Sequence, residues 1–337
     1  MNKNFFKNKS LLITGGTGSF GKALVKYFLK NKFPLRKLVI FSRDELKQFE
    51  MSQDFSVKKF PILRYFLGDI REKERLKYAV KDIDIVVHSA ALKQVPASEY
   101  NPFEFIKTNI IGSQNVIEAC LDSNVSHVIA LSTDKASSPV NLYGATKLCA
   151  DKLFTSAQNI VGKKKITFAI VRYGNVMMSR GSVIPKLLKE KSNGYFSITD
   201  PNMTRFNISL DESVNFVLNS LVSQRGGEIF IPKIPSYKLL DLCKAIDKNC
   251  KIKLIGIRPG EKVHEELISA FEAKNTLEFK NFFIILSNFK NYKKEVLAKK
   301  IRFVKKNFEY NSEKNDKFLS IKELRELIFR QKNNLYS

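Results

Sequence analysis

Short apolar segments alternate with longer amphipathic stretches through the first half of the chain. The apolar segments are Leu11 to Thr14, Leu38 to Phe41, Leu63 to Leu67, Ile83 to His88, Val128 to Ser132 and Thr167 to Arg172. Hydrophobicity is nearly continuous within each segment rather than alternating, as in strands that are buried on both faces of a parallel sheet. The pattern therefore predicts repeated βαβ units and an α/β fold with a doubly wound parallel sheet.

The pattern becomes less regular after Asn175, where prolines interrupt it at positions 185, 201, 232, 235 and 259. We expect residues 1–176 to form the main domain, with a return segment near 207–230. Residues 177–337 are expected to form mainly a smaller C-terminal lobe that is interleaved with the main domain. Ser320 and Glu323 make a capping-box pattern, which predicts a last helix that runs through Phe329.

The composition is that of an ordinary globular protein, with 44% hydrophobic and 27% charged residues in a chain of 337. No segment approaches the roughly 18 continuous apolar residues that a transmembrane helix needs. The N-terminal apolar run from Leu11 to Ile13 is too short for the core of a secretory signal. We therefore expect a cytoplasmic protein with no membrane partner.

Basic residues exceed acidic ones by 58 to 33, which gives a formal net charge of +25. Such an excess suits nucleic acid or small polyanions such as nucleotides. The charge is spread along the chain without a separate basic arm, and the abundance of Lys, Asn, Ile and Phe is typical of an AT-rich genome. We therefore expect no nucleic-acid partner.

The cysteines and histidines show no metal-binding pattern. Cys120, Cys149, Cys243 and Cys250 lack CxxC spacing, and the three histidines lie far apart in the sequence. We expect no metal site, and we expect four reduced, buried thiols.

A glycine-rich turn follows the first predicted strand. The sequence LITGGTGSFG from Leu12 to Gly21 leads into a predicted helix over Lys22 to Lys30. Glycine lets the backbone approach a pyrophosphate, whose charge is then met by the amides and the dipole of the helix N-terminus. The alternative is a merely tight turn. We predict a Rossmann-type dinucleotide site that includes Gly15, Thr17, Gly18, Ser19, Phe20 and Gly21.

The end of the second predicted strand bears on the choice of dinucleotide. An acidic residue there binds the free ribose hydroxyls of NAD, whereas a cation accepts the extra phosphate of NADP. Arg43 and Lys47 can pair with a 2′-phosphate while Ser42 donates a hydrogen bond, so NADP is favoured. Asp44 and Glu45 leave NAD open, and a solvated helix start is the alternative use of these charges.

A YxxxK motif, Tyr143 to Lys147, follows further along the chain. Residues four apart share one face of a helix, so the ammonium of Lys147 can lie beside the phenol of Tyr143 and the cofactor ribose. We expect the positive charge to lower the pKa of Tyr143, so that a phenolate takes a hydroxyl proton while NADP takes the hydride from the same carbon.

The sequence Ser132-Thr133-Asp134-Lys135 comes just after the fifth predicted strand, eight residues before the tyrosine. An oxidoreductase or epimerase needs only the hydroxyl and the tyrosine here. The added acid and amine of Asp134 and Lys135 suggest that a further proton is removed and that a hydroxyl is expelled. A surface salt bridge is the purely structural alternative.

With these motifs, the chain resembles the extended short-chain dehydrogenase/reductases and, among them, the inverting UDP-N-acetylglucosamine 4,6-dehydratases that begin pseudaminic acid synthesis. The resemblance covers almost the whole length. Beyond the glycine turn it rests on Ser42 to Lys47 (SRDELK), Ala90 to Pro96 (AALKQVP), Ser132 to Ala136 (STDKA), Asn141 to Lys147 (NLYGATK), Arg172 to Val176 (RYGNV), Met203 to Phe206 (MTRF) and Ile257 to Lys262 (IRPGEK).

The resemblance implies a closed hydride cycle. Tyr143, beside Thr133, would deprotonate the C4 hydroxyl as hydride passes to NADP, and the ketone would acidify the proton at C5. Lys135 would remove that proton, and Asp134 would protonate the departing C6 hydroxyl. Hydride would then return to C6, and C5 would receive a proton from the opposite face. Retaining dehydratases look to a Glu in place of Lys135.

The resemblance also implies the division of the chain and further contacts. Residues 1–176 would bind NADP, and the smaller lobe would bind the UDP-sugar, UDP-N-acetylglucosamine. The cofactor, or its border with the sugar, would be lined by Asp69, Ile70, Ala90, Ala91 and Lys93. The UDP-sugar would be approached by Lys93, Asn175, Arg180, Arg205, Arg258 and Glu261. Relatives imply a homo-oligomer, a dimer or a hexamer.

Alternative functions remain open at this point. The nearest are a UDP-sugar 4-epimerase and a bifunctional dehydratase/5-epimerase on the same scaffold; Lys135 disfavours the first and Tyr143 the second. An alternative of another class is a non-catalytic NADP sensor or nucleic-acid-binding regulator, which only the charge of +25 favours.

Overall fold

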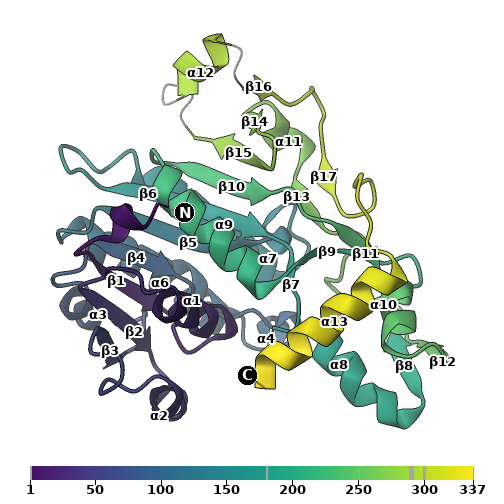
Figure 1. Cartoon of the computed structure of the whole chain (residues 1–337). Coiled ribbons are helices and arrows are strands. Elements are labelled where there is room, and N and C mark those ends of the chain that lie inside the picture. The colour runs from purple at the N-terminus through teal and green to yellow at the C-terminus, as the bar shows by residue number, and fades with distance from the viewer. Residues whose placement is uncertain (1, 180, 250, 288–291, 299–300, 337) are drawn as a thin grey trace.

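The computed structural model describes residues 2–179, 181–249, 251–287, 292–298 and 301–336. Its centre is a sheet in which the six predicted strands lie parallel in the order β3-β2-β1-β4-β5-β6 (Figure 1). They are β1 (Ser10–Thr14), β2 (Lys37–Ser42), β3 (Leu63–Leu67), β4 (Ile85–His88), β5 (His127–Thr133) and β6 (Thr167–Tyr173). This order is that of a Rossmann fold, so the predicted fold class is confirmed.

Later parts of the chain extend this sheet beyond β6. Strand β10 (Glu228–Pro232) pairs parallel to β6, and β15 (Phe282–Leu286) pairs antiparallel to β10. Two short strands, β14 (Thr276–Glu278) and β16 (Arg302–Phe303), complete the ten-stranded sheet. The sequence pattern did not indicate the return of β14 and β15.

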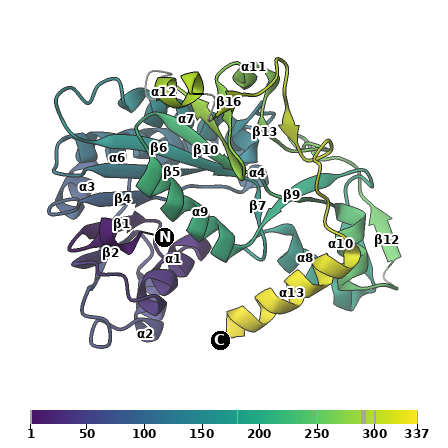
Figure 2. The same ribbon diagram turned by 45° about the horizontal axis from the view of Figure 1, so that its top comes forward.

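Helices cover both faces of the sheet (Figure 2). On one face α1 (Ser19–Lys30) packs against α9 (Leu210–Ser223), which a capping box of Ser209 and Glu212 opens. On the other face α6 (Gly112–Leu121) packs between α3 (Lys73–Ala79) and α7 (Leu142–Ala157). The remaining helices around this sheet are α2 (Glu45–Asp54), α4 (Val95–Tyr100), α5 (Pro102–Phe105), α11 (Ala270–Ala273) and α12 (Lys293–Leu297), with single turns η1 (Lys3–Phe6) and η3 (Asp134–Ala136) and a π-helical segment η2 (Ile106–Ile111).

A smaller lobe has a hydrophobic core of its own, formed by residues such as Leu187, Phe196, Leu242 and Leu324. It contains α8 (Val183–Glu190), η4 (Lys191–Asn193), α10 (Leu239–Ile246), α13 (Ile321–Tyr336), β8 (Tyr195–Ile198) and β12 (Lys251–Leu254). Short strands connect it to the main sheet: β7 (Asn175–Val176), β9 (Thr204–Ile208), β11 (Ser236–Lys238), β13 (Glu266–Ile268) and β17 (Tyr310–Asn311). The chain crosses repeatedly between the two parts, so the smaller lobe is fixed to the edge of the main domain.

The last helix and two of the cysteines have the structure that the sequence predicts, and a third cysteine does not. Ser320 and Glu323 form the predicted capping box, and the last helix extends beyond Phe329 to Tyr336. Among the described helices, none combines the length and apolar content that crossing a bilayer requires. Cys120 and Cys243 are buried, but the prediction of a buried thiol is wrong for Cys149, which lies on the exposed face of α7. Cys250 lies outside the described residues.

Candidate active site

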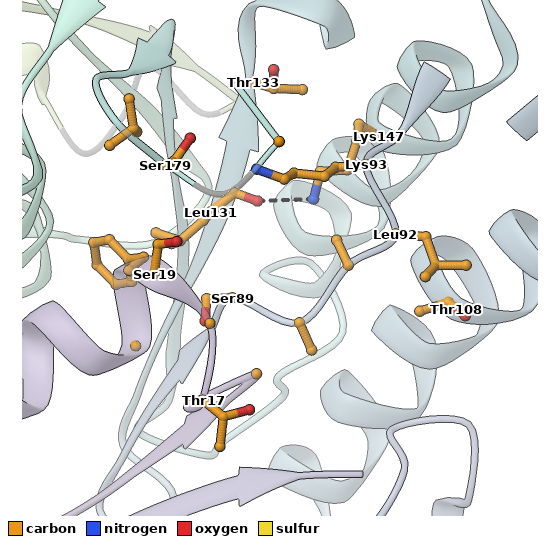
Figure 3. Close-up of a pocket in the computed structure, with 18 of the residues that line it drawn as sticks. Thr17, Ser19, Ser89, Leu92, Lys93, Thr108, Leu131, Thr133, Lys147 and Ser179 are labelled. Carbon is orange, nitrogen blue, oxygen red and sulfur yellow. Dashed lines mark hydrogen bonds between the residues drawn. The ribbon is translucent and has the colours of Figure 1, made fainter. Parts of the chain in front are cut away.

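A cavity of about 590 Å³ runs along the carboxyl ends of the parallel strands (Figure 3). Every cofactor-binding and catalytic residue predicted from the sequence lines it, and so does Asn175. The sheet topology explains this convergence, because the carboxyl ends of neighbouring parallel strands meet at one edge. The structure thus brings together residues that lie as far apart in sequence as Gly15 and Asn175.

Two positions of the glycine-rich turn, Gly15 and Gly21, have no room for a side chain. Gly15 adopts a left-handed backbone with φ of +65°, and a Cβ there would lie 2.8 Å from the backbone of Ala90. A Cβ on Gly21 would lie 2.4 Å from the carbonyl oxygen of Gly16. Because no side chains project from these positions, a pyrophosphate can approach the start of α1. The helix amides and the helix dipole favour its negative charge there. Next to it, the hydroxyls of Thr17 and Ser42 are hydrogen-bonded at 2.8 Å.

The end of β2 presents cations to the same cavity. Arg43 Nη1 lies 3.5 Å from a carboxylate oxygen of Asp69, and the ammonium of Lys47 is paired with Asp44. Asp44 also accepts a hydrogen bond from the Lys47 amide at 3.0 Å, which caps α2. These bonds from Lys47 lower the pKa of Asp44. Asp44 therefore serves as the cap of α2. Its presence at the end of β2 is explained by that role and leaves Arg43 available for a 2′-phosphate.

Tyr143 and Lys147 occupy one face of α7, whose start is capped by the side chain of Asn141. Burial raises the pKa of Tyr143 to about 12, while the charge of Lys135 and a hydrogen bond with Thr133 oppose that rise. The expectation that Lys147 lowers this pKa is wrong for the protein alone. The Lys147 ammonium donates to the Leu131 carbonyl at 2.8 Å (Figure 3), so the cation that acts on the phenol is that of Lys135.

Asp134 and Lys135 form an ion pair inside the cavity, with Asp134 buried and Lys135 partly buried, rather than a surface salt bridge. Lys135 Nζ lies 3.1 Å from Asp134 Oδ1, and Thr133 donates to the same oxygen at 2.9 Å. The Asp134 side chain is 1% exposed, and its other oxygen, Oδ2, has no hydrogen-bond partner within the described ranges. Burial raises the pKa of Asp134, although Lys135 opposes the effect. The carboxyl is thus suited to hold a proton and donate it.

Glu265 is a site residue that the sequence analysis missed. Its Oε1 lies 3.0 Å from Lys135 Nζ and 3.6 Å from Arg205 Nε. Burial of Lys135 disfavours its charge, but Asp134 and Glu265 outweigh burial and raise the pKa of Lys135 above its ordinary value. Glu265 follows Lys135 by more than a hundred residues, and the only signal for it was its position three residues after the IRPGEK motif.

Buried polar contacts fix the helix that carries Tyr143 to the strands beside it. Arg172 on β6 is fully buried and pairs with Asp151 on α7 at 3.1 Å and with Glu272 on α11 at 3.0 Å. Ser132, at the end of β5, donates to the same Asp151 carboxylate at 2.8 Å. This network ties α7 to β5 and β6, because Arg172 and Asp151 are both buried where water cannot replace either partner.

Three of the predicted UDP-contacting residues do not line this cavity. Arg205 is 8% exposed and donates to the backbone carbonyls of Thr204, Lys262 and Val263. Arg258 and Glu261 lie in the loop before β13, which the Asn141 side chain joins to the start of α7 by a 2.7 Å bond to the Gly260 carbonyl. Arg180 lies outside the described residues. Contacts of these four residues with UDP therefore stay predictions.

No cluster of three or more His, Cys, Asp or Glu side chains with metal-binding geometry occurs in the part of the chain that the structure describes.

Comparisons with known proteins agree with this geometry. The family model described as "Polysaccharide biosynthesis protein" matches residues 11–287. The chain is 53% identical over 331 residues to the UDP-N-acetylglucosamine 4,6-dehydratase (inverting) of Campylobacter jejuni subsp. jejuni serotype O:2, a match that covers 96% of this chain and 98% of that protein. It is 41% identical over 335 residues to the UDP-glucose 4-epimerase of Rickettsia bellii, with 96% of each chain covered. The X-ray structure of Pen from Bacillus thuringiensis superimposes with a TM-score of 0.87 at 39% identity, covering 97% of this chain and 99% of that one.

Proposed function

The chain belongs to the polysaccharide biosynthesis protein family, among the extended short-chain dehydrogenase/reductases, and on that premise we propose that it dehydrates UDP-N-acetylglucosamine across C4, C5 and C6 with inversion at C5. The product would be a UDP-4-keto-6-deoxy-L-arabino-hexulose that keeps the acetamido group. One observation carries the proposal: a carboxyl and an amine, Asp134 and Lys135, lie side by side in the cavity that also holds Tyr143.

The proposed mechanism divides the proton transfers among these side chains. A nicotinamide cofactor held along the glycine turn would supply a hydride acceptor for C4 and a hydride donor for C6. Tyr143 takes the proton of the C4 hydroxyl, and Lys135 takes the proton at C5, which the new ketone acidifies. Asp134 gives its proton to the C6 hydroxyl, which leaves as water while the C5–C6 double bond forms. C5 then receives a proton from the face opposite to the one that lost it.

The ion pair between Asp134 and Lys135 offers a way to prepare both groups at once. The mechanism needs a protonated carboxyl on Asp134 and a neutral amine on Lys135. An ion pair instead consists of a carboxylate and an ammonium. Transfer of one proton from Lys135 Nζ to Asp134 Oδ1 across 3.1 Å produces the acid and the base together. The raised pKa of Asp134, caused by its burial, favours this transfer, whereas the raised pKa of Lys135, caused by Asp134 and Glu265, opposes it.

We propose that the cofactor is NADP rather than NAD. The glycine turn provides the backbone space that a pyrophosphate requires, and Arg43 and Lys47 provide cations at the end of β2. Asp44 is occupied as the cap of α2, so it does not compete as a ribose-binding acid. A guanidinium suits a phosphate because its planar fork forms two parallel hydrogen bonds.

Arg43→Ala is expected to weaken NADP binding at least tenfold while it leaves NAD binding nearly unchanged, because a charge-assisted hydrogen bond contributes about 1.5–3 kcal/mol. Calorimetric titration of each cofactor measures both affinities. Arg36→Ala is the matched control, since Arg36 forms a half-exposed ion pair with Asp84 at 3.9 Å, away from the cavity. Equal losses for NADP and NAD would contradict a phosphate contact.

The function is tested by incubating the protein with NADP and UDP-N-acetylglucosamine in deuterated water, followed by NMR of the sugar. We expect a 4-keto-6-deoxy product with deuterium at C5 and inverted configuration there. Incorporation at C5 with retained configuration would contradict the inverting assignment, and absence of any 6-deoxy product would contradict the dehydration itself.

A UDP-sugar 4-epimerase is the second candidate, favoured by the 41% identity to the Rickettsia bellii protein. An epimerase needs Tyr143 and the cofactor but no group that removes the C5 proton. The same NMR experiment separates the two, because an epimerase inverts C4, keeps the C6 hydroxyl and introduces no deuterium at C5.

We also propose that the chain forms a homo-oligomer, a dimer or a hexamer. Large apolar side chains are exposed along α4, α5 and η2: Tyr100 (88% exposed), Phe103 (57%) and Ile111 (43%). A neighbouring copy would remove this surface from water, which supports association.

A further inference from the structure

The carboxylate of Glu265 is held in contact with the amine of Lys135. Glu265 directly precedes β13 and is 2% exposed, and its Oε1 lies 3.0 Å from Lys135 Nζ. Arg205, from β9, lies 3.6 Å from the same oxygen. The carboxylate therefore has two cations beside it, and one of them is the proposed base.

The backbone on which Glu265 sits is fixed from both sides. Its amide donates to the hydroxyl of Ser312 at 2.9 Å, and its carbonyl accepts from the Ser312 amide at 2.8 Å. That hydroxyl is also bonded to the Thr204 hydroxyl at 2.7 Å. Since β9 and the segment after β17 both hold this residue, the direction of its side chain toward Lys135 is set by the fold.

We propose that Glu265 is a positioning residue for Lys135, which aims the amine at C5 and stabilises the ammonium formed when C5 loses its proton. This inference rests on the proposed dehydration. In that step the C5–H bond breaks, the proton forms a new N–H bond on Lys135, and the electron pair moves toward the C4 ketone oxygen. The amine gains a positive charge 3.0 Å from a carboxylate, and that contact is strongest after the proton has moved.

Charged and titratable groups reach Lys135 from several elements. They are Asp134 beside it, Glu265 before β13, Arg205 on β9, Tyr143 on α7, Tyr237 on β11, Lys93 after β4 and Lys262 in the loop before β13. Burial favours a protonated Asp134, which suits an acid. For Glu265, burial also acts to raise the pKa, but Lys135 and Arg205 outweigh it and lower the pKa. Glu265 is therefore the carboxylate that keeps its charge beside Lys135.

Glu265→Gln tests the proposal, since it keeps the size of the side chain and removes its charge. Exchange of the C5 proton with deuterated solvent is measured from about pH 6 to about pH 11, so that the range reaches the ordinary pKa of lysine, alongside reduction of the cofactor by UDP-N-acetylglucosamine. Without the carboxylate the lysine is a weaker base, so we expect the highest exchange rate to fall roughly 10²-fold. The pKa of the lysine also falls, so the rise of exchange with pH should move about 1–3 units to lower pH. Cofactor reduction, which depends on Tyr143, should persist.

Two further variants and the unmodified protein complete the test. Glu266→Gln is the matched control: its side chain accepts from Ser137 and Ser138, and the amide oxygen of glutamine can still do so, so exchange should be unchanged. Glu265→Asp keeps the charge at a longer distance and should keep the pH dependence with a lower maximum rate. If the Gln variant does not fold, the Asp variant tests the proposal by itself, and an exchange rate equal to that of the unmodified protein would overturn it.

A Gln variant whose exchange has the same pH dependence as the unmodified protein would also overturn the proposal. A merely structural role of Glu265 would lower the rate without moving that pH dependence. Absence of exchange in the unmodified protein would instead refute the proposed dehydration.

Discussion

Tyr143→Phe is expected to lower turnover of UDP-N-acetylglucosamine by about 10³-fold, within the range that a positioned acid–base group supplies. The phenol lies in the cavity, and in the proposed mechanism it takes the C4 hydroxyl proton. Because oxidation at C4 comes first, its loss should abolish cofactor reduction, C5 exchange and water elimination together. Absorbance of the reduced nicotinamide in a single turnover measures the first step, and NMR measures the others.

The affinity for NADP should change little in this variant, because the glycine turn and Arg43 are untouched. Tyr65→Phe is a suitable control for the loss of a tyrosine hydroxyl: it removes a 2.8 Å hydrogen bond to the Phe55 carbonyl beside β3 and should leave turnover unchanged. Full C5 exchange in Tyr143→Phe would contradict the mechanism, since no proton at C5 is acidic until C4 is a ketone.

The main domain could be predicted because its signals are local. Each of the six strands contains an apolar run, although Arg64 interrupts β3, and Gly15 and Gly21 mark places where the backbone approaches itself too closely for a side chain. Strands of a parallel sheet end at a common edge, so the motifs that follow β1, β2, β4 and β5 had to meet in one cavity. The grouping of Asp134, Lys135 and Tyr143 follows from that rule and from the helical spacing in α7.

What the sequence did not predict depends on contacts between distant segments. Glu265 reaches Lys135 only because the loop before β13 folds against β9, and nothing near either residue encodes that contact. The return of β15 to the main sheet requires a partner, β10, that lies fifty residues earlier. The environment of Tyr143 was also misjudged: burial dominates its pKa, and Lys147 is bonded to the Leu131 carbonyl. Helical spacing predicts that Tyr143 and Lys147 lie on one face of α7, but it does not predict which group Lys147 binds.

Lys135→Ala is expected to remove C5 exchange and water elimination, with a loss of turnover of about 10³-fold, and to leave oxidation at C4 measurable. The reason is the order of the steps, since the amine acts only after Tyr143 has done so. Lys135→Gln refines the comparison, because its amide can still donate to Asp134 and Glu265 but cannot accept the C5 proton. The two variants should therefore fail alike in exchange, although Ala leaves the two buried carboxylates without their shared partner and should be the less stable in thermal unfolding.

The two variants of Lys135 also separate a catalytic amine from a structural one. If Lys135 only donated hydrogen bonds to Asp134 and Glu265, the Gln variant would regain much of the activity that Ala loses, and C5 exchange in Gln would approach that of the unmodified protein. If Lys135 is the base, both variants should accumulate reduced nicotinamide with the oxidised sugar, because the cycle stops before elimination. Lys73→Ala, which breaks a surface pair with Glu118, is the control for removing a lysine and should leave every step intact.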